Sequence, residues 1–158
     1  MTRLAIAVAL SVLASTAYAQ HSGGAHGAHK MVMPADLKWA AVPSLPPGAQ
    51  ISVIEGPMNE AVPFTIRLKL PKDYYVIPAH SHPAIERVTV LSGTFHMGTG
   101  DKFDKTKTHA LTAGAIGIMQ PGTNHSAWTA EESIVQLNGN GPWGVTYVNP
   151  ADDPRRTQ

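Results

Sequence analysis

The amino-acid sequence predicts an all-β protein, built as an antiparallel sandwich or barrel, and three observations support this class. Short apolar runs recur along the chain with turn residues between them. The 14 Gly and 13 Pro among 158 residues favour turns and short strands over long helices. No window of about a dozen residues shows the apolar period of an amphipathic helix. The length suits one domain with its own core.

The clearest strand is the run PFTIRLKL at residues 63–70, in which apolar and polar side chains alternate. A period of two places the apolar set on one face of a strand and the polar set on the other. Eight further runs predict short strands, at residues 74–78, 86–93, 94–98, 109–113, 115–119, 126–130, 133–139 and 143–148.

Two of the intervening turns predict hairpins. Gly93 ends the run at residues 86–93 and supplies the turn into residues 94–98. Pro121 and Gly122 form a tight turn before a strand that begins at His125.

The first 19 residues have the pattern of a signal peptide. Arg3 precedes an apolar run from Leu4 to Ala14, and Ala17-Tyr18-Ala19 has the small-x-small form that signal peptidase accepts. A membrane anchor is the alternative, but the run is shorter than the roughly 20 residues that span a bilayer. We therefore expect export to the periplasm or the medium, with no membrane attachment after cleavage.

Residues 20–36 predict a disordered Gly- and His-rich linker, residues 37–150 the folded domain and residues 151–158 a C-terminal tail. The histidines of the linker, His21, His26 and His29, are either plain linker residues or a weak Cu or Zn site. The chain has no cysteine, so disulfides and thiolate ligands are both excluded.

The charge balance argues against a nucleic-acid partner. Twelve basic residues oppose 11 acidic ones, which leaves a formal net charge of +1 with neutral His. No stretch gathers Lys and Arg into a stripe that could follow a phosphate backbone.

A cluster of metal-ligand residue types stands out at residues 80–86. His80 and His82 are two positions apart, so on an extended backbone both imidazoles project from one face. Pro83 interrupts the strand before Glu86 begins the next one. We expect these three ligands to come from two adjacent strands. The competing interpretation is that both histidines lie at the surface beside a proline turn, with Glu86 solvated.

His125 is the expected fourth ligand, because it begins the strand after the Pro121-Gly122 turn. Three imidazoles and one carboxylate leave one or two positions open on a five- or six-coordinate ion. This donor set suits Mn, Fe, Ni, Cu or Zn as a divalent ion. An exported protein meets an oxidising environment in which Fe(II) is hard to keep, which favours Mn, Zn and Cu.

These residues resemble the two sequence motifs of the cupins. The first motif, Gly-x5-His-x-His-x3or4-Glu-x6-Gly, is matched by His80, His82, Glu86 and Gly93, with Tyr74 in place of the leading glycine. The second, Gly-x5-Pro-x-Gly-x2-His-x3-Asn, is matched by Gly114, Gly122 and His125; Gln120 takes the proline position, and Thr129 replaces the asparagine. The departures alter turns and remove no ligand. The resemblance implies a jelly-roll barrel, the double-stranded β-helix, around a divalent metal.

Two functions fit this resemblance. In the first, the protein is a metalloenzyme acting on a small oxygen-bearing organic molecule, with Glu86 or His96 as the base. Dioxygenase chemistry is favoured, with lyase and isomerase chemistry as alternatives. In the second, the protein binds a small ligand or the metal without turnover.

Other residues near the predicted pocket are weaker candidates for a role in the site. Phe95, Met97 and Trp128 either wall an apolar chamber or pack a core. Arg67 either anchors a substrate carboxylate or lies on a solvated strand face, and Gln136 and Tyr147 are candidates for orienting a ligand or water. An exposed sheet edge and the apolar arm at residues 37–48 are compatible with a homodimer.

Overall fold

The computed structural model describes residues 29–74 and 76–157, and all its strands lie in the compact unit that begins at Val32. The predicted signal peptide at residues 1–19 lies outside the described residues, as does the linker up to residue 28. In the described part of the chain, no helix has the length and hydropathy needed to cross a membrane.

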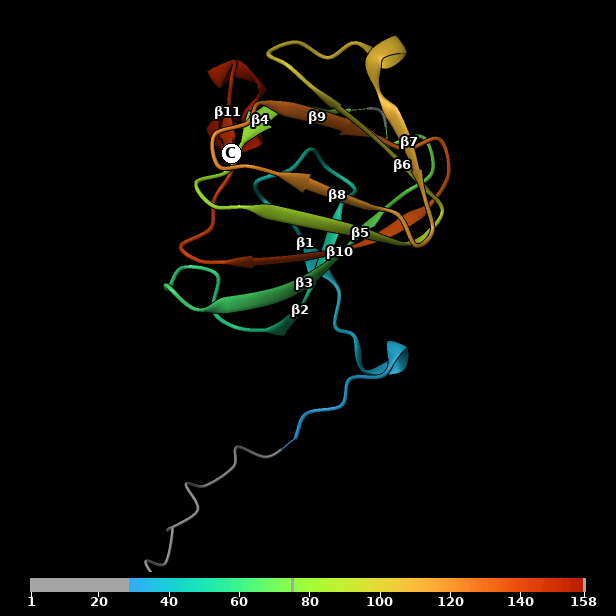
Figure 1. Cartoon of the computed structure of the whole chain (residues 1–158), viewed down its shortest axis with the longest axis vertical. Helices are drawn as coiled ribbons and strands as arrows, with labels where there is room; N and C mark the ends of the chain where they lie inside the picture. The colour runs from blue at the N-terminus through green and yellow to red at the C-terminus, as the bar shows by residue number, and fades with distance from the viewer. Residues whose placement is uncertain (1–28, 75, 158) are drawn as a thin grey trace, which may run out of the picture. The chain divides into compact units, whose positions relative to one another are not determined.

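Two antiparallel sheets lie face to face in this unit (Figure 1). The first has six strands in the order β1 (Ala40–Ala41), β2 (Gln50–Glu55), β3 (Pro63–Leu70), β10 (Ser133–Asn140), β5 (Glu86–Ser92) and β8 (Ile116–Met119). The second has five strands in the order β11 (Thr146–Tyr147), β4 (Ile77–Ser81), β9 (His125–Trp128), β6 (Thr94–Thr99) and β7 (His109–Thr112). Four short 3-10 helices complete the described elements: Pro34–Asp36, Lys105–Lys107, Pro150–Asp152 and Pro154–Thr157.

The core lies between the sheets and follows from the alternation of apolar side chains. In β3 the apolar positions are buried and the residues between them are half-buried, as the sequence predicted. The buried cluster includes Phe64, Ile66 and Leu68 of β3, with Phe95 and Met97 of β6. Burial of such side chains contributes roughly 1.5 to 3 kcal/mol each. The all-β prediction is therefore confirmed, including its antiparallel arrangement.

Both predicted hairpins are wrong, because their strands lie in different sheets. The turn at Gly93 joins β5 of the six-stranded sheet to β6 of the five-stranded one, and the turn at Pro121-Gly122 likewise joins β8 to β9. Gly93 has a φ of 74° and Gly122 also has a φ of 74°, a region that glycine adopts without strain. A tight turn has the same residue chemistry whether it folds a strand back or leads it across a barrel, so the sequence alone could not separate the two.

Two strand boundaries also differ from the prediction. The strand placed at residues 74–78 is β4, which runs from Ile77 to Ser81. Tyr74 lies before β4, with its side chain buried and its hydroxyl donating to the carbonyl of Pro46. The strand placed at residues 143–148 shortens to β11 (Thr146–Tyr147), because the main chain of Trp143 and Gly144 bonds to Met58 and to the His82 side chain and not to a strand.

The arm before β2 folds back on its own chain. β1 pairs with β2, and the Nζ of Lys69 lies 4.6 Å from the centroid of the Trp39 ring. Leu45 is buried in the core. The apolar residues of this arm therefore cover the protein's own sheet.

Candidate metal centre

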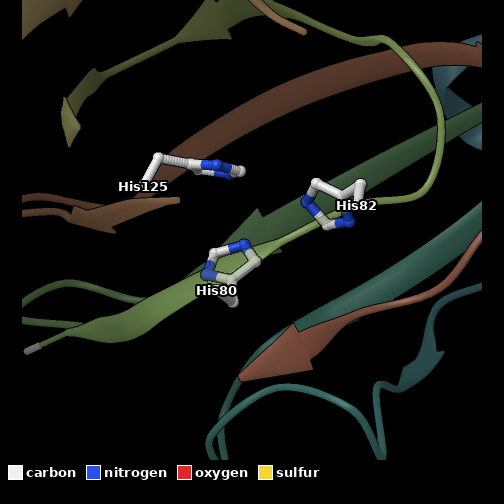
Figure 2. Close-up of side chains that lie close together, drawn as sticks. All are labelled: His80, His82 and His125. Atoms are coloured by element: carbon white, nitrogen blue, oxygen red, sulfur yellow. The ribbon is translucent and has the colours of Figure 1, made fainter. Parts of the chain in front are cut away.

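Three histidines converge between the sheets (Figure 2). His80 of β4 and His125 of β9 are direct cross-strand partners, and their ring centroids are 4.3 Å apart. His82 follows the last residue of β4, two positions after His80. One ring nitrogen from each residue can be chosen so that all three lie within 4.8 Å of one another. All three side chains are buried.

Glu86 reaches the same place from the opposite sheet, as the first residue of β5. The sequence prediction that the ligands come from two adjacent strands is therefore wrong in its geometry. In its sheet β4 lies between β11 and β9, whereas β5 belongs to the other sheet. From β3 to β6, consecutive strands alternate between the two sheets, so that ligands close in sequence approach from two sides.

The outer nitrogen of each imidazole is held by a main-chain carbonyl. The Nδ1 atoms of His80, His82 and His125 lie 2.7, 2.7 and 2.9 Å from the carbonyl oxygens of Pro78, Gly144 and Thr123. A carbonyl can only accept, so each Nδ1 carries the proton and donates. In the neutral ring the proton is then absent from Nε2, whose lone pair is available to a metal.

The carboxylate of Glu86 lies beside two of these lone pairs. Glu86 Oε1 is 3.4 Å from His82 Nε2, and Glu86 Oε2 is 3.2 Å from His125 Nε2. His82 Nε2 and Glu86 Oε2 are nonetheless buried without a hydrogen-bonding partner among the described residues. Lone pairs and a carboxylate gathered in a low-dielectric interior repel one another unless a cation lies between them.

The proton affinities of these groups have the pattern expected of a cation site. Burial, then the neighbouring His125 and His82, lowers the pKa of His80 to about 3. Burial alone would raise the pKa of Glu86, but the adjacent His125 and His82 lower it to about 2. Burial opposes protonation of His125, yet its contact with Glu86 raises its pKa. The ionised carboxylate of Glu86 therefore favours a positive charge within the cluster.

The residues fit a divalent transition metal. His80, His82 and His125 could hold such an ion through Nε2, with a Glu86 oxygen beside them as a further donor. Mixed imidazole and carboxylate donors suit Mn, Fe, Ni, Cu and Zn, and do not choose among them.

A cavity of about 310 Å³ opens onto this cluster. Its wall is mainly apolar, with Ile66, Leu68, Phe95, Met97, Val135 and Trp143 among the lining residues. Glu86 is the only carboxylate among the described residues that line it, and Arg155 is the only Lys or Arg. The cavity therefore has the size and the mainly apolar lining typical of a small-molecule site, and it lies beside the candidate metal ligands.

His96 does not line this cavity. Its neighbours Phe95 and Met97 point inward from β6, so His96 points outward, where it is half-buried. Its ring stacks on Trp128, with the centroids 3.9 Å apart and the planes 16° apart. Lys105 lies over the same indole, with Nζ 4.0 Å from its centroid. Because β6 separates His96 from the ligands, it is not placed to act as a base there.

The other sequence candidates are engaged in hydrogen bonds with the protein itself, and the Tyr147 ring lies 5.8 Å from that of His80, centroid to centroid. The Nε of Arg67 donates to Oε1 of Gln136 over 3.1 Å, across β3 and β10. The hydroxyl of Tyr147 donates to the carbonyl of Ser44 over 2.8 Å. These bonds connect strands and loops of the fold.

Sequence reasoning missed the contribution of the C-terminal segment. Trp143 stacks on His82, with centroids 4.1 Å apart, and Gly144 supplies the carbonyl that holds its Nδ1. Arg155, in the predicted tail, lines the cavity while its Nη2 donates to the carbonyl of Val145 and its guanidinium pairs with Asp153. The one available signal was a tryptophan in the turn-like stretch GPWG, which has no periodicity that would assign the side chain to a face.

Comparison with known proteins places this fold. No protein-family model matches the sequence, and no curated protein matches it. Among solved structures, the polyketide cyclase RemF from Streptomyces resistomycificus has a TM-score of 0.65 at 18% identity, covering 81% of this chain and 91% of its own. A proposed acetylacetone dioxygenase from Methylibium petroleiphilum PM1 has a TM-score of 0.60 at 17% identity, covering 80% and 85%.

A third structure gives the fold its name. An RmlC-like cupin from Shewanella frigidimarina has a TM-score of 0.56 at 15% identity and covers 71% of this chain and 90% of its own. The two facing antiparallel sheets and these matches show that the chain has the cupin fold, the double-stranded β-helix. Its site is a buried histidine cluster that could hold a metal ion.

Proposed function

We propose that this protein is an exported metalloenzyme that acts on a small, mainly apolar organic molecule bearing metal-binding oxygen atoms. One observation carries the proposal: three Nε2 lone pairs and an ionised carboxylate face one another at an apolar cavity of about 310 Å³. A site that only stabilised the fold would not need such a cavity beside its ligands.

The cavity chemistry limits the substrate. Its apolar wall favours a hydrocarbon skeleton, and the charge of a divalent ion exceeds that of the one carboxylate in the lining by one unit. The residual positive charge favours a substrate oxygen that ionises, as in a phenol, a β-diketone or a hydroxy acid. The bound metal would supply Lewis acidity and, for a redox-active ion, reaction with O2.

Residues of the chain set up this chemistry in three ways. The carbonyls of Pro78, Gly144 and Thr123 keep the Nδ1 protons in place, so the Nε2 atoms stay directed inward. The apolar wall excludes water from the reacting end of the substrate. Glu86 is the lining carboxylate that could accept a proton from the substrate.

Among the possible reactions we favour oxidation by O2, with insertion of oxygen into the substrate. Three histidines and one carboxylate would leave one or two positions open on a five- or six-coordinate ion, which could supply reaction with O2 if the ion is redox-active. Support from relatives is limited to the fold, although one structural neighbour is a proposed acetylacetone dioxygenase. Lyase and isomerase chemistry remain alternatives that use the same residues.

A non-catalytic binding protein is the second candidate, and the position of His96 favours it. With His96 on the outer face of β6, the described part of the cavity wall offers no titratable base besides Glu86 and the three histidines. A site that holds a ligand without turnover would need no separate base.

The test begins with the mature protein purified from its own compartment. We expect close to one equivalent of a single transition metal by elemental analysis, and O2 uptake when phenols, β-diketones or hydroxy acids are added. Saturable binding of these molecules without product would support the binding protein.

Replacement of either His80 or His125 by Ala should remove most of the metal and leave the β-sheet circular dichroism largely intact. Normal metal content in both variants would contradict the proposed site. Recovery of the wild-type protein from the cytoplasm, with residues 1–19 still attached, would contradict export.

A further inference from the structure

A single short segment holds one face and one edge of His82. The indole of Trp143 lies parallel to the imidazole of His82, with the planes 15° apart and the centroids 4.1 Å apart. The next residue, Gly144, accepts the Nδ1 proton of the same ring over 2.7 Å. His82 follows the end of β4, so the ladder of that strand does not hold it as it holds His80 and His125.

This segment, residues 141–148, is the C-terminal strap, and hydrogen bonds hold it at both ends. At its start, the N–H of Gly141 donates to Val62 and that of Trp143 donates to Met58, over 3.0 and 2.7 Å. Both acceptors lie in the loop between β2 and β3. At its end, β11 pairs with β4, and the N–H of Val148 donates to Ala79 over 2.9 Å.

Close packing fixes Trp143 further. Its ring lies 5.2 Å from that of Phe64, whose side chain is only 1% exposed. Gly141 has no room for a side chain, since a Cβ there would lie 2.6 Å from the Met58 carbonyl oxygen. The indole is thus held between a rigid core residue and the metal-ligand candidate.

We infer that Trp143 is a positioning residue for the metal centre. Its indole sets the plane of the His82 ring, and the carbonyl of Gly144 sets the rotation of that ring within the plane. This rests on the proposed metal site. A flat indole face prevents the imidazole from tilting, and the hydrogen bond fixes which nitrogen points inward. The strap therefore holds the His82 side chain, while a hydrogen bond from the Gly122 N–H to the His82 carbonyl, over 2.9 Å, holds its backbone.

The test compares two substitutions that fill the same space with different shapes. Trp143→Phe keeps a flat ring against His82, whereas Trp143→Leu fills the space without one. Zn2+ affinity is measured by competition with a chelator, and the Co2+ form is examined by visible absorption, which reports ligand geometry. We expect the Leu variant to bind roughly 10- to 100-fold more weakly with an altered Co2+ spectrum, as for other residues that orient ligands. The Phe variant should recover most of the affinity and the spectrum.

A second tryptophan provides the matched control. Trp128 stacks on His96 with nearly the same geometry, but outside the cavity. Trp128→Leu should lower the melting temperature while leaving Zn2+ affinity and the Co2+ spectrum at their wild-type values. If Trp143→Leu fails to fold, Trp143→Met takes its place with the same expectation.

The outcomes separate this inference from the proposed function. If the wild-type protein binds no metal stoichiometrically, the proposed site itself is wrong. If the wild type binds metal and the folded Leu or Met variant matches it in affinity and spectrum, the site stands and the positioning role of Trp143 is overturned. Equal losses in the Phe and Leu variants would also overturn it, because the flat ring would then not be the cause.

Discussion

The protein contains two histidine–tryptophan stacks of nearly the same geometry in very different surroundings. His82 and Trp143 have ring planes 15° apart, and His96 and Trp128 have planes 16° apart. His82 is buried beside a carboxylate and an apolar cavity, whereas His96 is half-buried beside a lysine. Stacking on an indole is therefore not what makes a histidine a metal-ligand candidate. What distinguishes His82 is the nearby carboxylate of Glu86 and the hydrogen bond from its Nδ1 to the carbonyl of Gly144.

The largest expected difference between the stacks is in metal content. His82→Ala removes one of three imidazole donors from a buried site and leaves Glu86 less well compensated. We expect it to lose most of the metal, while His96→Ala retains about one equivalent. Elemental analysis of the two purified variants measures this, and equal metal contents would break the distinction between the stacks.

The metal should also stabilise the folded protein, and this effect should depend on His82 and not on His96. An ion that binds only the native state at 100 times its Kd stabilises by about 2.7 kcal/mol. For a domain of this size that corresponds to a rise in Tm of roughly 10 °C. Thermal unfolding with and without added metal should show this rise in the wild type and in His96→Ala, and little of it in His82→Ala. An unchanged Tm in the wild type would argue against a tight native-state site.

Glu86 places a negative charge beside His82, whereas the charged residue beside the His96–Trp128 stack is Lys105. Glu86→Gln keeps the shape of the side chain and removes its negative charge, so we expect the metal affinity to fall by roughly ten-fold or more. Without the carboxylate, the pKa of His125 should also fall, since Glu86 is what raises it. Chelator competition and NMR titration of the metal-free protein measure the two effects. Wild-type affinity in this variant would exclude Glu86 from the site.

The smallest expected effect concerns the stack of His96 on Trp128. Burial, then the charge of Lys105, lowers the pKa of His96 from its usual 6.5. Because the folded state disfavours the proton, this group's contribution to stability is present above pH 6.5 and is lost as the pH falls below it. Lys105→Gln should raise the pKa of His96 in an NMR titration and leave metal affinity unchanged. A pKa that stays the same would mean that Lys105 does not act on this ring.

The sequence predicted the parts of the fold that depend on local patterns. The period of two in PFTIRLKL predicted β3 over Pro63–Leu70, and the turn residues predicted most of the strands that follow. His80 and His82 have a spacing that places both imidazoles on one face of an extended chain, and they do converge. These inferences hold because strand geometry repeats every two residues wherever the strand lies.

Contacts between distant segments could not be predicted in the same way. The turn at Gly93 does not reveal which sheet the chain enters next, and alternation alone allowed His96 to face either in or out. Trp143 and Arg155 lie in a stretch without periodicity, so their places at the cavity had no local signal.

By itself, the sequence determined that this chain forms short antiparallel strands and carries histidines and a glutamate with metal-ligand spacing. Only the tertiary structure decided that Glu86 approaches from the opposite sheet, that His96 faces away, and that the C-terminal strap reaches His82. The physical reason is that side-chain direction along a strand follows from local backbone geometry, whereas the partners across a barrel follow from how the two sheets close over a shared core.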